Sequence, residues 1–156
     1  MGLISTGDLI SYRRATDGNI VGEQARKQLG RDFIWPRSVE SGEPAAKAAR
    51  SLLKRSPGKP AAEVPMYHAG LYARADALVP ESGGYVLRET KASTFPLKKD
   101  KVTPAAPEEH HLNDVAIQVR VMRGSGLKLK RAELNLLDNQ WRYPGRGNYS
   151  GLFRQL

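Results

Sequence analysis

Apolar residues recur along the chain with two different spacings, and these separate helical segments from extended ones. A helical spacing, bounded by glycine or proline, predicts helices at residues 20–29, 43–54 and 108–123. Short apolar runs between glycine and proline clusters predict strands at residues 64–68, 71–79, 85–92 and 131–137, with a further candidate at 140–144. The first 17 residues are weakly patterned, and the segment after residue 144 has a turn-like composition.

The order of these segments predicts the fold class. Two helices, three strands, a helix and two strands are typical of a sheet with helices on its faces. We therefore expect an α/β fold, an α/β/α sandwich with a central mixed β-sheet. The 156 residues suit one domain with one core, spanning residues 1–156.

The segment Pro80–Gly84 predicts a hairpin turn between two strands, and its centre fixes which residues face each other. Facing residues on antiparallel strands have numbers that add to a constant. A turn centred between Ser82 and Gly83 sets that constant at 165, which places Asp76 opposite Glu89. Lys91 lies on the same face as Glu89, because side chains alternate along a strand. A slip of one residue would separate the two carboxylates.

Two facing carboxylates and a nearby lysine indicate a specific chemistry. Like charges directly opposite each other destabilise a sheet, so the pair should share a proton or hold a divalent cation. Oxygen ligands suit Mg²⁺ or Mn²⁺. Lys91 could then orient a metal-bound water or neutralise charge on a phosphate. The alternative is an exposed Asp76 beside a surface ion pair of Glu89 and Lys91.

The composition adds a strong positive charge, +9 from 25 Lys and Arg against 16 Asp and Glu. This favours a polyanionic partner, nucleic acid before any other, although a solvated basic surface is the alternative. The basic residues expected to contact nucleic acid lie in the loop 95–107 and around the last predicted helix and strand: Lys98, Lys99, Lys101, Arg120, Arg123, Lys128, Lys130 and Arg131.

Several classes of protein are disfavoured. The absence of cysteine excludes disulfides, iron–sulfur clusters and thiolate zinc sites. The sequence shows no apolar run of about 18 residues and no signal-peptide pattern, so we expect a cytoplasmic location without membrane contact.

The pattern Asp76…Glu89-x-Lys91, on a hairpin within this order of elements, resembles the PD-(D/E)XK nuclease superfamily. Within this superfamily, the chain most resembles the RecB-like branch, which includes the CRISPR-adaptation nucleases. The likeness covers residues 63 to 153 and the GNIVGEQAR segment. It implies a restriction-endonuclease-like core and a nuclease that hydrolyses DNA with Mg²⁺ or Mn²⁺. In this family the two acids ligate the metal and the lysine takes part in catalysis.

The resemblance also points to residues on the helices. A helix-borne acid often completes the site, and Glu23 occupies that place, although its spacing from Lys27 equally indicates an exposed ion pair. The branch carries a Gln-x-x-x-Tyr element. Here Gln118 is present and could reach a phosphate or base, whereas Met122 replaces the tyrosine and is expected in the core.

Weaker candidates and other functions remain open. Glu63 opens the first strand, and His68 lies at its end, where it could face the site. His110 and His111 are adjacent, so we do not expect both to ligate one metal easily. The alternative functions are a catalytically inactive nucleic-acid-binding module and an interaction domain of a defence or repair complex. RNA as substrate, a protein partner and a homo-oligomer are further options.

Overall fold

A computed structural model describes residues 6–38 and 40–156, with side chains from residue 17 onward. Its strands form one five-stranded sheet in the order β1-β2-β3-β4-β5. Their bounds are β1 Ala61–His68, β2 Leu71–Glu81, β3 Gly84–Thr94, β4 Leu129–Leu137 and β5 Phe153–Gln155. The β3–β4 pair is parallel and the other neighbouring pairs are antiparallel, so the sheet is mixed as expected.

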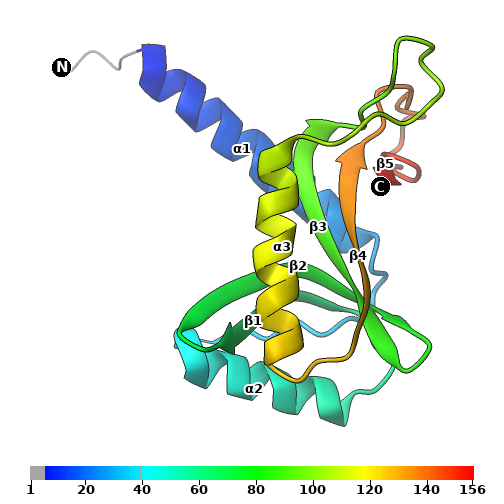
Figure 1. The fold of residues 1–156 in the computed structure, drawn as a ribbon. Coiled ribbons are helices and arrows are strands. Elements are labelled where there is room, and N and C mark those ends of the chain that lie inside the picture. The colour runs from blue at the N-terminus through cyan, green and yellow to red at the C-terminus, as the bar shows by residue number, and fades with distance from the viewer. Residues whose placement is uncertain (1–5, 39) are drawn as a thin grey trace.

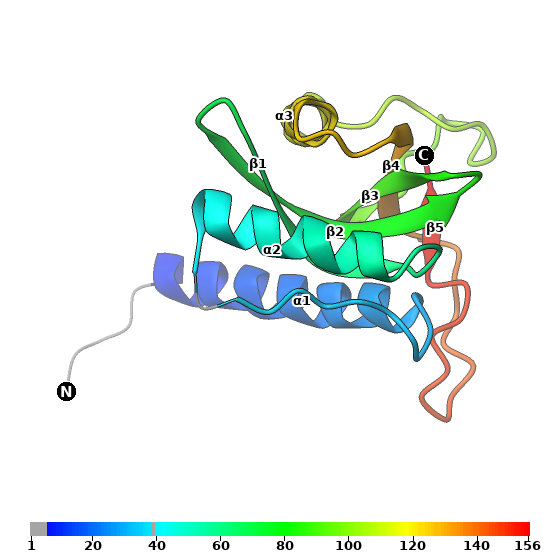
Figure 2. The same cartoon turned by 90° about the horizontal axis from the view of Figure 1, so that it is seen from below.

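The helices are α1 Thr6–Lys27, α2 Gly42–Arg55 and α3 Glu109–Gly124. α1 and α3 lie on opposite sides of β3 and β4, and α2 packs against β1 (Figures 1 and 2). This arrangement is compatible with an α/β sandwich. Among the described residues, no helix has both the length and the apolar character needed to cross a bilayer.

One buried apolar cluster joins the sheet to two helices. Ala49 and Leu53 of α2 and Val121 and Met122 of α3 meet buried residues of the first three strands there. Met122 is fully buried, which confirms its predicted place in the core.

Two predictions at the ends of the chain are wrong. α1 begins at Thr6 rather than near residue 20 and is continuous through residues 16–19, where the composition is typical of a turn. An exposed glycine inside a helix costs only about 1 kcal/mol, so Gly18 does not end it. The strand proposed at 140–144 is a loop, and the last strand is instead β5, in the segment expected to be turns. Phe153 is buried there and pairs with Leu137.

The β2–β3 hairpin has the predicted register. Ala77 pairs with Arg88 and Leu78 with Leu87, in agreement with the constant of 165. At the turn, Ser82 has φ 40° and Gly83 has φ 74°. Positive φ at both central residues is the requirement of a type I′ turn, whose twist matches that of the flanking strands.

The turn gives a first testable prediction. Ser82→Asn should stabilise the fold by about 0.5–1 kcal/mol, because asparagine tolerates the left-handed region better than serine. Gly83→Ala is the opposite case and should destabilise it by about 1–2 kcal/mol. Urea unfolding of both variants measures the effect, and an asparagine variant no more stable than the parent would contradict the assignment of the turn.

The hairpin ladder ends at Asp76, and this is what creates the site. From the turn inward, β2 and β3 pair as far as Ala77 and Arg88. At the next position the backbone N–H of Thr90 donates to Oδ2 of Asp76 at 2.8 Å, in place of a strand-to-strand carbonyl. Further along, β2 continues beside β1 and β3 continues beside β4. A carboxylate therefore lies at the point where the two strands separate.

Candidate active site

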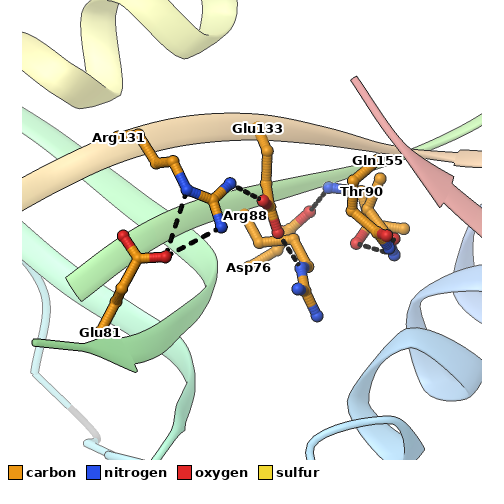
Figure 3. A network of polar contacts seen from close by, with 8 residues as sticks. Asp76, Glu81, Arg88, Thr90, Arg131, Glu133 and Gln155 are labelled. Atoms are coloured by element: carbon orange, nitrogen blue, oxygen red, sulfur yellow. Dashed lines mark hydrogen bonds and ion pairs between the residues drawn. The ribbon is translucent and has the colours of Figure 1, made fainter.

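Asp76 lies in a pocket between α1 and the sheet. The pocket has a volume of about 530 Å³. Its polar and charged lining comes from α1, β1, β2 and β3: Asn19, Glu23, Arg26, Glu63, Arg74, Asp76, Arg88, Thr90 and Lys91. Figure 3 shows Asp76 directed toward Thr90 beneath β4.

Glu89 and Lys91 form a polar chain with α3. Glu89 is 7% exposed and accepts a hydrogen bond from Nε2 of Gln118 at 2.7 Å. Nζ of Lys91 lies 3.0 Å from Oε1 of Glu89 and 2.6 Å from Oδ2 of Asp114. The chain of contacts thus runs from Gln118 through Glu89 and Lys91 to Asp114, linking β3 to the first half of α3.

Asp114 is the residue of this chain that sequence reasoning missed. It lies four positions before Gln118, and residues at that spacing share one face of a helix. That spacing was the available signal, since a candidate at Gln118 implies that an acid one turn earlier faces the same strand.

The charges around Asp76 are unbalanced. Burial first, and then the nearby charge of Glu89, raise the pKa of Asp76 to about 7, even though the hydrogen bond from Thr90 acts to lower it. Lys91 also lowers it, but its ammonium is already paired with Glu89 and Asp114. Within the described part of the chain, Asp76 makes no ion pair of its own.

Lys91 is held in its protonated form. Burial disfavours its charge, but the hydrogen bonds with Asp114 and Glu89 outweigh that effect and raise the pKa of Lys91. Conversely, the hydrogen bond with Lys91 lowers the pKa of Asp114. Lys91 is therefore a positioned cation at neutral pH rather than a free base.

The donor atoms near Asp76 suit a hard divalent cation. The carboxylates of Asp76 and Glu89 are oxygen ligands of the kind that Mg²⁺ and Mn²⁺ prefer. Oε1 of Gln118 is buried and has no hydrogen-bond partner, so an acceptor is left unsatisfied beside Glu89. A half-buried carboxylate with a raised pKa and no paired cation is the electrostatic condition that a bound metal ion would relieve.

Glu23, the third expected ligand, is already paired with a lysine. It lines the same pocket as Asp76, but its carboxylate pairs with Lys27 at 2.8 Å and its side chain is 57% exposed. The hydrogen bond with Lys27 also lowers the pKa of Glu23. The structure therefore has the exposed pair that was the alternative interpretation of this residue. Glu63 is likewise engaged, by Arg26 at 3.0 Å and Arg74 at 3.1 Å.

The three histidines lie near the two ends of α3. The rings of His110 and His111 are 4.1 Å apart at the start of α3, and their nitrogens lie within 4.8 Å of each other and of a Glu108 oxygen. Side-chain torsions thus overcome the divergence of adjacent positions, contrary to our expectation. The positive end of the α3 dipole disfavours a cation at that point. His68 lies against Gly124, at the opposite end of α3.

The predicted nucleic-acid contacts are exposed on two elements. Lys98, Lys99 and Lys101 lie in the loop after β3, where Asp100 accepts hydrogen bonds from Val102 and Thr103 and fixes the turn. Arg120 and Arg123 lie on the exposed side of α3. Exposure makes these side chains accessible to a phosphate, and their contact with nucleic acid stays a prediction.

A buried ionic network is a second feature that the sequence did not reveal. Glu133 of β4 is 5% exposed and accepts a hydrogen bond from Nε of Arg88 at 2.6 Å. Arg131 binds the other oxygen of Glu133 and also Glu81, as Figure 3 shows. Arg131 is thereby committed to acidic neighbours, whereas Arg88 lies on the wall of the pocket beside Asp76.

Comparisons with models of known protein families, with curated protein sequences and with solved structures found no match to this chain. The functional argument therefore depends on the geometry of the site.

Proposed function

We propose that this protein is a Mg²⁺- or Mn²⁺-dependent nuclease that hydrolyses phosphodiester bonds of DNA, on a restriction-endonuclease-like core. The observation that carries the proposal is the position of Asp76. It is half-buried where the hairpin separates, close enough to Glu89 and Lys91 for their charges to act on its pKa, which is raised, and it has no cation paired to it among the described residues.

Each side chain has a defined task in this proposal. Asp76 and Glu89 would hold the metal ion. The ion would lower the pKa of a water bound to it and would place positive charge next to the phosphate. Lys91 places its ammonium next to Glu89, where it neutralises charge that builds on the phosphate oxygens. Gln118 and Asp114 are positioning residues, because they orient Glu89 and Lys91 through hydrogen bonds.

The direct test combines metal binding with cleavage. Calorimetric titration with Mn²⁺ should show binding heat, and labelled single- and double-stranded DNA should be cut with Mg²⁺ or Mn²⁺ but not with EDTA. Absence of both binding heat and cleavage would refute the proposal.

A catalytically inactive nucleic-acid-binding module is the second candidate, favoured by the engagement of Lys91 with two carboxylates. Such a module should bind DNA with an affinity that falls steeply with salt and without any metal requirement. An interaction domain should neither bind nor cut DNA without its protein partner.

Asp114→Asn tests the role of Asp114 as a positioning residue. Loss of its negative charge removes one of the interactions that raise the pKa of Lys91. If protonated Lys91 is required, cleavage declines as pH rises through the pKa of Lys91, and the variant should show this decline at lower pH. The cleavage rate measured across alkaline pH reports the shift. An unchanged profile would show that Asp114 does not act through Lys91.

A further inference from the structure

Three aromatic rings cluster in the loop between β4 and β5, residues 138–152, which we call the aromatic loop. Trp141 stacks with Tyr149 at a centroid distance of 5.9 Å, and Tyr143 lies 5.2 Å from Tyr149. The two tyrosines are nevertheless 52% and 39% exposed, for Tyr143 and Tyr149 respectively. The cluster therefore presents ring surface to solvent and is not a closed core.

Hydrogen bonds hold this loop in a defined shape. Nε1 of Trp141 donates to the carbonyl of Ser150 at 2.9 Å. The backbone N–H of Gly147 donates to the hydroxyl of Tyr143 at 2.7 Å. The exposed rings are thus fixed in position before any ligand arrives, which reduces the entropy lost on binding.

A groove connects the aromatic loop to the candidate active site. A hollow of about 630 Å³ is lined on one side by Gln24, Lys27 and Gln28 of α1 and on the other by Gly147 and Tyr149. Figure 2 shows the aromatic loop, drawn in orange and red, near the C-terminal end of α1. Arg88 lines both this hollow and the pocket of Asp76, so the two depressions adjoin at its side chain.

The chemistry of this surface indicates its ligand. Exposed tyrosine faces bind unstacked bases, and the bases of a duplex offer no free face. Lys27 and Arg88 line the groove, each paired with one carboxylate, and Arg142 and Arg146 are exposed on the aromatic loop. The overall charge of +9 favours a polyanion.

We propose that the aromatic loop is a base-stacking platform for single-stranded nucleic acid, with Tyr149 and Tyr143 holding bases of a strand whose backbone passes Arg88 toward Asp76. This inference rests on the proposed nuclease function, because the strand is taken to lead to the site of cleavage at Asp76. Binding of bases to the aromatic loop can nevertheless be measured without metal and without cleavage.

The test measures affinity in EDTA for three fluorescent probes about 12 nucleotides long: an oligothymidylate, an abasic strand and a duplex. Tyr149→Ala should weaken oligothymidylate binding roughly tenfold, since base–aromatic stacking contributes about 1–3 kcal/mol. Its affinity for the abasic strand, which keeps the phosphates and lacks bases, should not change. The unmodified protein should prefer the single strand to the duplex.

Matched variants separate stacking from other effects. Tyr149→Phe keeps the ring and should retain the affinity. Tyr72→Ala removes a similarly exposed tyrosine, 45% exposed, at the distant start of β2, and should not affect binding. Equal loss for the oligothymidylate and the abasic strand, or no loss for either, would overturn the proposal.

A second readout covers the case in which Tyr149→Ala does not fold. In a Trp35→Phe background, Trp141 is the only tryptophan left. Its fluorescence should be quenched by the oligothymidylate and not by the abasic strand, and equal responses would overturn the platform. DNA cleavage that is unaffected by Tyr149→Ala, with unchanged binding, would refute the platform alone. Base-dependent binding without any cleavage would refute the nuclease alone.

Discussion

Lys91→Ala should lower the rate of metal-dependent DNA cleavage by about 100-fold or more, because a pre-positioned charge at a reacting phosphate typically contributes that much. Affinity for DNA should change far less, since many other basic residues contribute to binding. Single-turnover cleavage and fluorescence anisotropy measure the two quantities on the same protein.

Two controls make this result specific. Lys54→Ala removes an exposed lysine of α2 and should leave cleavage unchanged. Lys91→Arg keeps the charge but changes its geometry, so it should restore only part of the rate. A Lys91→Ala protein that folds and still cuts at the parental rate would remove Lys91 from the site.

The second large effect concerns stability and pH. Because the pKa of Asp76 is raised from 3.8 to about 7 in the folded state, the folded protein binds more protons than the unfolded chain between these values. In the metal-free protein, the free energy of unfolding should therefore fall as pH rises from about 4 to about 7. Asp76→Asn should remove this loss and, at about 1.4 kcal/mol per pKa unit, stabilise the fold above neutral pH by up to roughly 4 kcal/mol.

Bound metal should offset much of the stability that the variant gains over the parent. Asparagine retains an oxygen for the Thr90 N–H but loses the negative charge that attracts a cation. Mn²⁺ at about 100 times its dissociation constant should stabilise the parent by about 2.7 kcal/mol and the variant much less. Cleavage should be lost in the variant, so activity and metal-free stability change in opposite directions.

Urea unfolding at several pH values, with EDTA or Mn²⁺, measures both parts. Asp32→Asn is the matched control, because Asp32 is a largely exposed partner of Lys59 and should show neither effect. If Asp76→Asn were less stable than its parent at pH 8 without metal, the charge of Asp76 would not destabilise the fold and the prediction would be wrong.

The sequence predicted the β2–β3 hairpin well because its information is local. A two-residue turn with serine and glycine at its centre fixes the pairing from Glu81–Gly84 as far as Ala77–Arg88, and Asp76 and Glu89 follow at the next position, where the ladder ends. The sequence of α3 likewise located Met122 in the core. It singled out Gln118 only as a group that could reach a phosphate or base, and the contact of Gln118 with Glu89 came from the structure.

Other features depended on contacts between distant segments. The first turns of α1 were missed because residues 6–17 have little apolar pattern. β5 was missed because it is a strand only through its pairing with the edge of β4. The partners of Glu89 and Lys91 on α3 are 29 and 23 residues away from them, respectively, and Glu133 is 45 residues from Arg88. A sequence pattern shows which residues carry charge but not which of them meet.

By itself, the sequence determined the order of the sheet elements, the register of the hairpin and the nature of the acidic and basic groups on it. These follow from backbone conformation and side-chain alternation, which act over a few residues. Only the tertiary structure decided that Asp76 has no paired cation within the described part of the chain, whereas Glu89 and Glu23 each have one. Burial and charge pairing depend on the packing of helices against the sheet, and that packing joins residues far apart in the chain.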